Sequence, residues 1–249
     1  MKDMPDKPRS EMTIVQLLPN LLTITSICAG LTAIRFGFQG NYELSVQLIL
    51  VAAILDGLDG RLARLLKSDS KMGAELDSLA DFLNFGVAPP LVIYFWALQD
   101  LAGAGWIAVL IFAVCCVVRL ARFNVGTKSD FESKDSRFFV GVPAPAGALL
   151  AMLPMYVSFS ISDRLIVPAI LVSGYLVVIG LLLISRVPTW SFKTVTVSRE
   201  NVKFFLVGFA FVGAAVLTYA WTTLVLLCLA YVAVVIWALV SSKGNRLQN

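Results

Sequence analysis

Four aspartates lie within a stretch of 26 residues, in two segments that are otherwise apolar enough to be membrane helices. Asp56 and Asp59 are three residues apart, and Asp77 and Asp81 are four apart. On a helix each pair therefore lies on one face, separated by about one turn. A carboxylate in hydrocarbon costs several kcal/mol unless another group offsets that cost. We therefore expect the two acidic faces to converge on a common ligand.

The polar run from Arg64 to Gly73 predicts a tight turn between two antiparallel helices, so that the four carboxylates reach a similar depth. Converging carboxylates repel each other, and hard divalent cations such as Mg²⁺, Mn²⁺ or Ca²⁺ relieve this repulsion. The chain has no His, and its four cysteines lie in apolar runs without metal-binding spacing, which argues against zinc or copper. The oxygen-only inventory predicts that Mg²⁺ or Mn²⁺ binds at Asp56, Asp59, Asp77 and Asp81.

Small residues flank both acidic pairs and would let a ligand approach the backbone closely: Gly57, Gly60, Ala63 and Gly73. Arg64 stands one turn from Gly60, where it could hold a phosphate while the cations hold another oxygen. This arrangement suits phosphoryl transfer, because that reaction needs the protein to position the substrates and neutralise charge rather than to form covalent bonds. The alternative is a purely structural network of buried salt bridges between the aspartates and Arg61 or Arg64.

The composition indicates the elements that must position these residues. With 58% hydrophobic and 14% charged residues over 249 positions, the chain is typical of a polytopic membrane protein rather than a soluble domain. About 20 apolar residues can span a bilayer, and eight such windows occur, at about 17–38, 43–66, 74–98, 104–124, 143–160, 164–185, 202–219 and 221–241. We therefore predict an all-α membrane bundle of about eight transmembrane helices.

The connections between these windows alternate in charge. Those at 66–73, 125–142 and 186–201 are polar and basic, whereas the others are short and poor in Lys and Arg. By the positive-inside rule the basic connections and both termini are cytoplasmic, so the acidic site faces the cytoplasm. The predicted division is a tail or interfacial helix at 1–16, a membrane domain at 17–241 and a cytoplasmic tail at 242–249.

Two further groups of polar residues lie within predicted spans. Asn84 follows Asp81 by one turn, just before Pro89 and Pro90, which we expect to kink or break the helix. Its amide would bond either Asp81 or a neighbouring helix, and we favour Asp81. Arg119 and Arg122 share one face at the cytoplasmic end of the fourth window. They are either snorkelling anchors or ligands for an anion such as a carboxylate or phosphate, which bidentate arginine suits; we favour the second.

The acidic stretch resembles the signature of a known family. Written as Asp56-x-x-Asp59-Gly60-x-x-Ala63-Arg64-x8-Gly73-x3-Asp77-x3-Asp81, it matches every signature position of the CDP-alcohol phosphotransferases, integral membrane enzymes of phospholipid synthesis. The resemblance implies that Asp56, Asp59 and Asp77 hold two metal ions, while Asp81 is a further ligand and the base for the acceptor hydroxyl. It implies that the CDP and phosphate groups contact Gly60, Ala63, Arg64 and Gly73.

The first span is also similar to that family. Many members begin it with a Pro-Asn-x-x-Thr pattern beside the nucleotide, and this chain has Pro19, Asn20 and Thr23 at those places. The resemblance therefore implies that Asn20 and Thr23 contact the nucleotide. The alternative is that they only cap the start of the helix.

Secondary patterns resemble the phosphatidylserine synthases within the family. They are the run from Asp77 to Pro89, Arg119-x-x-Arg122-Phe-Asn124, Gly141-x-Pro143-x-Pro145 and Pro188-Thr-x-Ser-Phe-Lys193. They imply transfer of a phosphatidyl group from CDP-diacylglycerol to L-serine, giving phosphatidylserine and CMP, with Arg119 or Arg122 on the acceptor. The implied setting is a prokaryotic cytoplasmic (inner) membrane, with the lipid bilayer as a partner and no nucleic acid partner. The last two spans would serve packing, lipid contact or the interface of a homodimer.

Two alternatives stay open. The same chemistry could use glycerol phosphate, inositol phosphate or choline as the acceptor, because the core signature is common to all these enzymes. From a different class, four intramembrane carboxylates could line the pathway of a divalent-cation transporter. Transporters often carry inverted repeats, and the chain contains no second copy of the acidic pair, while Arg64 beside the site disfavours a cation path.

Overall fold

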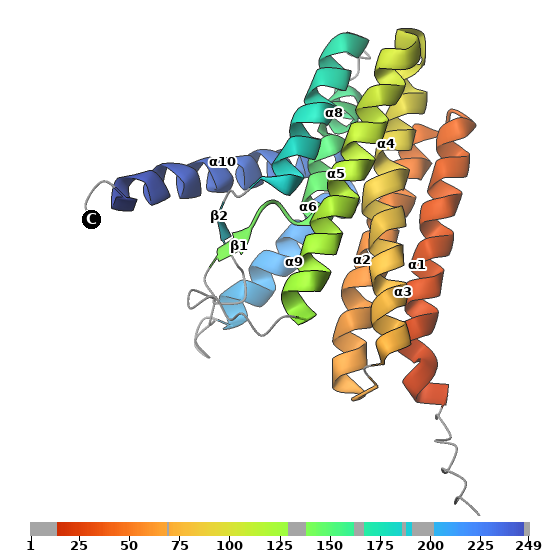
Figure 1. Cartoon of the computed structure of the whole chain (residues 1–249), viewed down its shortest axis with the longest axis vertical. Helices are drawn as coiled ribbons and strands as arrows, with labels where there is room; N and C mark the ends of the chain where they lie inside the picture. The colour runs from red at the N-terminus through yellow and green to blue at the C-terminus, as the bar shows by residue number, and fades with distance from the viewer. Residues whose placement is uncertain are drawn as a thin grey trace, which may run out of the picture.

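The computed structural model describes residues 14–68, 70–128, 138–161, 167–185, 188–190 and 202–246. These residues form a bundle of helices that lie mostly side by side (Figure 1). The predicted N-terminal tail at 1–16 lies almost wholly outside the described residues. Half of the basic connection at 125–142, and all of the one at 186–201 except 188–190, also lie outside the described residues.

The first two helices form an antiparallel pair. α1 spans Ile14–Phe38 and α2 spans Tyr42–Leu65. Gly40 has a φ of +79° in the connection, a conformation that glycine adopts without steric cost. The side chain of Asn41 then caps α2 by accepting a hydrogen bond of 3.3 Å from the backbone N–H of Leu44. This pairing carries the polar end of α1 alongside the acidic end of α2.

A tight turn follows α2, as the sequence predicts. α3 spans Lys71–Asp81, and its N-cap Ser70 accepts a hydrogen bond of 2.9 Å from the backbone N–H of Gly73. A serine at this position satisfies one of the free N–H groups at a helix start. The turn reverses the chain, so that α2 and α3 lie side by side at this end of the bundle (Figure 1).

The helix that begins with α3 continues without interruption to Leu101, which differs from the expected kink or break. After α3 come the π-helical η1 (Phe82–Val87), α4 (Ala88–Ile93), the π-helical η2 (Tyr94–Leu98) and the 3₁₀-helical η3 (Gln99–Leu101). Pro89 and Pro90 occupy the first turn of α4, where a missing N–H costs least. The helix therefore passes the two prolines without a break, between the π-helical turns of η1 and η2.

The second half of the chain packs against this first layer. α5 runs along α8, and α10 packs on α7 and then extends sideways out of the bundle (Figure 1). One core joins the two halves and includes Phe85, Phe112, Met152, Tyr156 and Leu176. The remaining helices are α5 (Ala102–Lys128), α6 (Ala144–Ala151), α7 (Leu153–Ser160), α8 (Ala169–Ile184), α9 (Val202–Thr218) and α10 (Ala220–Arg246).

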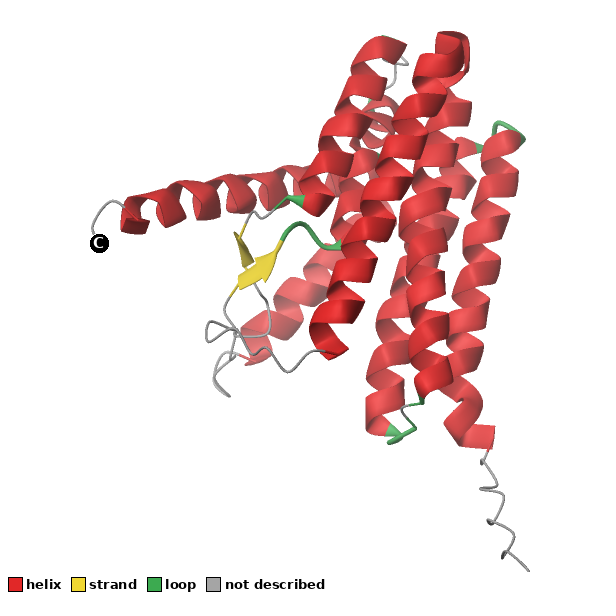
Figure 2. Cartoon of the chain, viewed as in Figure 1, coloured by secondary structure: helices red, strands yellow, loops and turns green. Residues whose placement is uncertain are grey.

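One short antiparallel ribbon accompanies the helices, and the sequence did not predict it (Figure 2). β1 (Phe138–Val140) pairs with β2 (Pro188–Trp190). Gly141 follows β1 with a φ of +89°, and a Cβ there would lie 2.8 Å from the carbonyl oxygen of Ser185. Glycine is therefore required where the chain passes the carboxyl end of α8.

The described helices overlap the eight predicted windows, but the window at 143–160 is divided between α6 and α7, and not all of the helices have the length and composition of a membrane span. Among the described residues, four helices are long and apolar enough to cross a bilayer: Leu17–Phe38, Lys71–Leu101, Gly103–Val125 and Ala220–Ala238. α2 has the length of a span, but it carries Glu43, Asp56, Asp59, Arg61 and Arg64. The protein is thus an all-α, multi-pass membrane protein, and the count of eight and the side of the termini stay predictions.

Candidate active site

Three of the four predicted metal ligands meet at one point. Asp56 and Asp59 on α2 and Asp77 on α3 each offer a carboxylate oxygen, and these oxygens all lie within 4.8 Å of one another. Asp59 is only 2% exposed, whereas Asp56 and Asp77 are partly buried. The spacing of three residues in α2 and the turn into α3 therefore bring the carboxylates together as the sequence predicts.

Two oxygens of this cluster are buried and have no hydrogen-bond partner among the described residues: Oδ1 of Asp56 and Oδ1 of Asp59. Buried polar atoms are rarely left unpaired, and a carboxylate buried without a partner is strongly unfavourable. An oxygen-only set of this kind fits a hard divalent cation, and the residues of this site therefore suit Mg²⁺ or Mn²⁺. The salt-bridge alternative fails among the described residues, since Arg61 is exposed and Arg64 bonds a backbone carbonyl.

Asp81 lies next to this group rather than within it. Its carboxyl group is close enough to that of Asp56 for the two to interact electrostatically. It is the last residue of α3, directly before the wide turn of η1. Asp81 is thus placed beside a metal ligand but outside the three-carboxylate cluster, on the side that faces α5.

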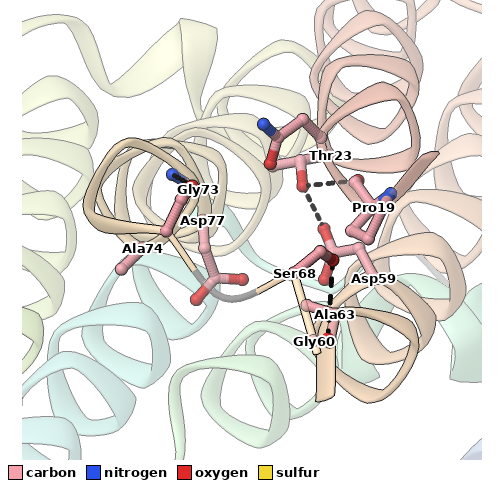
Figure 3. Close-up of a pocket in the computed structure, with 11 residues that line it drawn as sticks. Pro19, Thr23, Asp59, Gly60, Ala63, Ser68, Gly73, Ala74 and Asp77 are labelled. Carbon is pink, nitrogen blue, oxygen red and sulfur yellow. Dashed lines mark hydrogen bonds between the residues drawn. The ribbon is translucent and has the colours of Figure 1, made fainter. Parts of the chain in front are cut away.

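A pocket of about 190 Å³ opens beside the cluster and contains Asp59 and Asp77 in its wall (Figure 3). Five of the six residues predicted to contact the CDP and phosphate groups line it. They are Asn20, Thr23, Gly60, Ala63 and Gly73, accompanied by Pro19, Ser68, Ser70 and Ala74. The pocket is therefore built from α1, α2, α3 and the turn between the last two helices.

Thr23 connects this pocket to a carboxylate. Its hydroxyl lies 2.5 Å from Oδ2 of Asp59 and 3.1 Å from the carbonyl oxygen of Pro19 (Figure 3). A hydroxyl has one proton to donate, and the carboxylate is the closer and stronger acceptor. Thr23 therefore orients Asp59, and it does more than cap the start of α1.

The glycines of the pocket have different roles. A Cβ on Gly60 would meet no atom within 4 Å, so its missing side chain leaves open space in the pocket. A Cβ on Gly73 would lie 3.0 Å from Oδ1 of Asn20 and 3.1 Å from the hydroxyl oxygen of Ser70. Gly60 thus leaves room for a ligand, and Gly73 leaves room for the side chains that surround one.

Arg64 does not line the pocket. Its side chain is exposed, and its Nε donates a hydrogen bond of 3.0 Å to the carbonyl oxygen of Gly60 in the same helix. Of the residues predicted to contact the nucleotide, it alone lies outside the pocket wall.

Asn84 does not bond Asp81, so the contact that we favoured from the sequence is wrong. Its side chain is fully buried, and its Nδ2 donates a hydrogen bond of 3.1 Å to the hydroxyl oxygen of Ser26 on α1. The wide turn of η1 rotates the residues after Asp81 relative to a regular α-helix. The amide therefore faces the neighbouring helix, which was the alternative interpretation.

The two arginines of α5 have separate environments. Arg119 is partly buried and close enough to Asp81 to interact electrostatically, while its Nε donates to the carbonyl oxygen of Val142. Arg122 is exposed, and its Nη1 donates a hydrogen bond of 3.1 Å to the carbonyl oxygen of Ile184, at the end of α8. The structure thus brings Arg119, but not Arg122, to the acidic face.

Several polar residues near the site were not singled out from the sequence. Ser68 and Ser70 line the pocket from the turn. Tyr231 of α10 has a buried hydroxyl for which the described part of the chain offers no hydrogen-bond partner, and it is an electrostatic neighbour of Arg119. The hydroxyl groups of the turn could have been noticed as pocket candidates from their place between the acidic pairs. Tyr231 had no such signal, because only the packing of α10 brings it there.

Comparisons with known proteins agree with this geometry. The model of the CDP-alcohol phosphatidyltransferase family matches residues 16–179. A relative from Mycobacterium leprae, named CDP-diacylglycerol–serine O-phosphatidyltransferase, is 41% identical over 237 residues, which are 92% of this chain and 76% of that protein. Relatives of the same name from Mycobacterium bovis and Helicobacter pylori (strain J99) are 38% identical over 242 residues and 35% over 197 residues. They cover 95% and 79% of this chain, and 83% and 80% of their own length.

The matched region contains α1, the acidic cluster, the pocket and Arg119. The sequence signature, the meeting of the carboxylates and the family match therefore agree. The chain belongs to the CDP-alcohol phosphatidyltransferase family.

Proposed function

We propose that the protein is a CDP-diacylglycerol:serine O-phosphatidyltransferase. In this reaction the hydroxyl oxygen of L-serine forms a bond to the phosphorus that carries diacylglycerol, and the bond from that phosphorus to CMP breaks. The hydroxyl proton passes to a base, and the products are phosphatidylserine and CMP. One observation carries the proposal: three carboxylate oxygens lie within 4.8 Å beside a pocket of small and hydroxyl-bearing residues.

The carboxylates of Asp56, Asp59 and Asp77 would hold two divalent cations, Mg²⁺ or Mn²⁺, with Asp81 as a further ligand. Bound there, such cations would neutralise the charge of the diphosphate and of the departing CMP. Asn20, Thr23, Gly60, Ala63 and Gly73 would line the CDP group, since all of them line the pocket. Arg64 would reach a phosphate after its exposed side chain turns away from the carbonyl of Gly60.

Asp81 would accept the proton of the serine hydroxyl. Its position supports this role, because it lies beside Asp56 and outside the group of three ligands. A general base must lie within hydrogen-bond reach of the proton that it takes. A serine hydroxyl between Asp81 and the cluster would be close both to the base and to the phosphorus.

Arg119 would hold the serine carboxylate, while Arg122 is a weaker candidate. Arg119 lies near Asp81, and its Nε already bonds Val142. The two terminal NH₂ groups of its guanidinium could therefore each donate a hydrogen bond to a carboxylate, a bidentate geometry that arginine favours. Tyr231 would add a second donor from α10, because its hydroxyl is buried near Arg119 and has no partner among the described residues.

The site would face the cytoplasm of a prokaryotic cell, where CDP-activated lipid and free serine meet. The basic side chains Arg61, Arg64, Lys67 and Lys71 surround the turn beside the pocket, as the positive-inside rule requires of a cytoplasmic end. Homodimerisation through the last helices remains a prediction, tested by the mass of the purified protein in detergent.

The test is incubation of the purified protein with CDP-diacylglycerol, Mn²⁺ and one acceptor at a time, with CMP release and lipid product measured together. L-serine should release CMP and give phosphatidylserine, whereas glycerol phosphate, inositol phosphate and choline should not. Faster CMP release with another acceptor would support the same transfer reaction but show that serine is not the preferred acceptor. Divalent-cation flux into protein-containing vesicles without any CMP release would instead favour a transporter.

A further inference from the structure

A chain of buried hydrogen bonds joins the helices that carry the two acidic pairs. Asn84 of η1 and Ser26 of α1 are both fully buried, and Asn84 donates to the hydroxyl oxygen of Ser26 at 3.1 Å. Ser26 in turn donates to the backbone carbonyl of Thr23 at 2.9 Å. Thr23 is 3% exposed, and its hydroxyl bonds Asp59 of α2. α1 is therefore bonded on one side to Asp59 and on the other to the helix of Asp77 and Asp81.

The contact between Asn84 and α1 depends on a glycine. A Cβ on Gly30 would lie 2.1 Å from Oδ1 of Asn84, which is closer than any real contact of this kind. The amide thus rests directly against the backbone of α1. Because neither helix can slide or rotate without meeting this close contact, Asn84 fixes the axial position of its helix against α1.

Stability alone does not account for an asparagine at this position. Oδ1 of Asn84 is buried and has no hydrogen-bond partner within the described part of the chain, which is unfavourable in a packed interior. Leucine has a similar size and would fill the space without an unpaired polar atom. Unsatisfied buried groups are instead common where a protein must hold a geometry for function.

Asn84 follows Asp81 by three residues, in a continuous helix, so a shift of Asn84 along α1 also moves Asp77 and Asp81. The bond from Thr23 holds Asp59 to a point on α1 only three residues from Ser26. We propose that Asn84, acting through Ser26 and α1, is a positioning residue that keeps Asp77 and Asp81 in register with Asp59 for divalent-cation binding. This inference rests on the proposed metal site but not on the identity of the acceptor.

The first test measures binding of Mn²⁺ to the purified, metal-free protein by electron paramagnetic resonance, with thermal unfolding of the same samples. Asn84→Leu should raise the Kd for Mn²⁺ by about tenfold, the usual scale for groups that orient metal ligands. The melting temperature of the metal-free variant should equal or exceed that of the wild type. Wild-type affinity in a folded Asn84→Leu protein would overturn the proposal.

Ser45→Ala provides the matched control. Ser45 is also fully buried, and its hydroxyl donates a hydrogen bond of 2.7 Å to the carbonyl oxygen of Ala33. This bond also joins α2 to α1, but at a part of α1 that is far from the carboxylates. This variant should lower the melting temperature and leave the Kd for Mn²⁺ unchanged. An equal rise in Kd for Ser45→Ala would reduce the role of Asn84 to general helix packing.

Ser26→Ala keeps the proposal testable if Asn84→Leu does not fold. It should also weaken Mn²⁺ binding, and the double variant should bind no more weakly than the weaker of the two single variants, because both remove the same bond. Fully additive effects would contradict a shared bond.

The wild-type protein distinguishes this proposal from the proposed reaction. Tight Mn²⁺ binding without CMP release would overturn the proposed reaction alone, and absence of Mn²⁺ binding would overturn both proposals.

Discussion

The hydroxyl of Thr23 on α1 donates a hydrogen bond of 2.5 Å to Oδ2 of Asp59 on α2. A residue predicted to contact the nucleotide thus also orients a metal ligand. Thr23→Val keeps the shape of the side chain and removes the donor, so we expect the Mn²⁺ concentration for half-maximal activity to rise about 10- to 100-fold. Thr23→Ser keeps the hydroxyl and should stay near the wild type. Equal behaviour of the two variants in a titration with Mn²⁺ would contradict this role.

Each of the variants Asp56→Asn, Asp59→Asn and Asp77→Asn should lower kcat/KM by about 100-fold or more at limiting Mn²⁺, since each removes a charge that holds the cations. Folding should survive, because neutralising one carboxylate relieves repulsion within the metal-free cluster. Melting temperatures below that of the wild type would indicate a structural role. Asp81→Asn should lower kcat even when Mn²⁺ is saturating, because the base itself is lost.

Chelation with EDTA should abolish CMP release, and added Mg²⁺ or Mn²⁺ should restore it. Zn²⁺ should restore little, because it prefers nitrogen and sulfur ligands and this cluster offers only oxygen. Initial rates after exhaustive metal removal provide the measurement. Undiminished activity in the stripped protein would disprove the metal site.

The two arginines that flank the site should affect different substrates. Arg119→Lys keeps the charge and loses the planar fork, so the KM for serine should rise more than the KM for CDP-diacylglycerol. Arg64→Lys should do the reverse, because the exposed Arg64 bonds the backbone carbonyl of Gly60, a residue that lines the pocket. The measurement is steady-state kinetics with the second substrate saturating.

Tyr231→Phe tests the same assignment from α10. It removes only the hydroxyl, and the KM for serine should rise while that for CDP-diacylglycerol stays unchanged. Arg122→Lys is the comparison on α5, since Arg122 bonds the end of α8 rather than facing Asp81. Equal effects of all these changes on both substrates would leave the serine pocket unassigned.

Gly60→Ala should raise the KM for CDP-diacylglycerol without unfolding the protein, because its Cβ would enter open space within the pocket. Gly174→Ala is the matched control. It lies in α8, and its Cβ would also meet no atom within 4 Å. Both changes favour a helix by up to about 1 kcal/mol, so both should melt no lower than the wild type. An unchanged KM for CDP-diacylglycerol in Gly60→Ala would exclude a substrate contact at the part of the pocket that Gly60 lines.

Local spacing was enough to predict the centre of the site. The pairs Asp56 with Asp59 and Asp77 with Asp81 depend only on helical periodicity, and the polar run before Gly73 predicts the turn that brings them together. The structure confirms the meeting of Asp56, Asp59 and Asp77. Asn20 and Thr23 were added by resemblance to a family, and both line the pocket.

Contacts that depend on tertiary packing were not predictable. The direction of Asn84 depends on the wide turn of η1, which lets the helix pass Pro89 and Pro90 without a break. Arg119 and Arg122 look equivalent in the sequence, and only the positions of α3 and α8 separate them. The ribbon of β1 and β2 has three residues in each strand, which is too short for an alternating pattern to stand out.

The uninterrupted helix from Lys71 to Leu101 also bears on the depth of the acidic site. Its 31 residues extend roughly 46 Å at about 1.5 Å per residue, whereas the hydrocarbon of a bilayer is only about 30 Å thick. The part that follows Asp81 is long enough to cross that thickness by itself. Asp77 and Asp81 can therefore lie level with the lipid headgroups, where water lowers the cost of their charge. A lipid substrate could then present its phosphate to the carboxylates while both acyl chains stay in the leaflet.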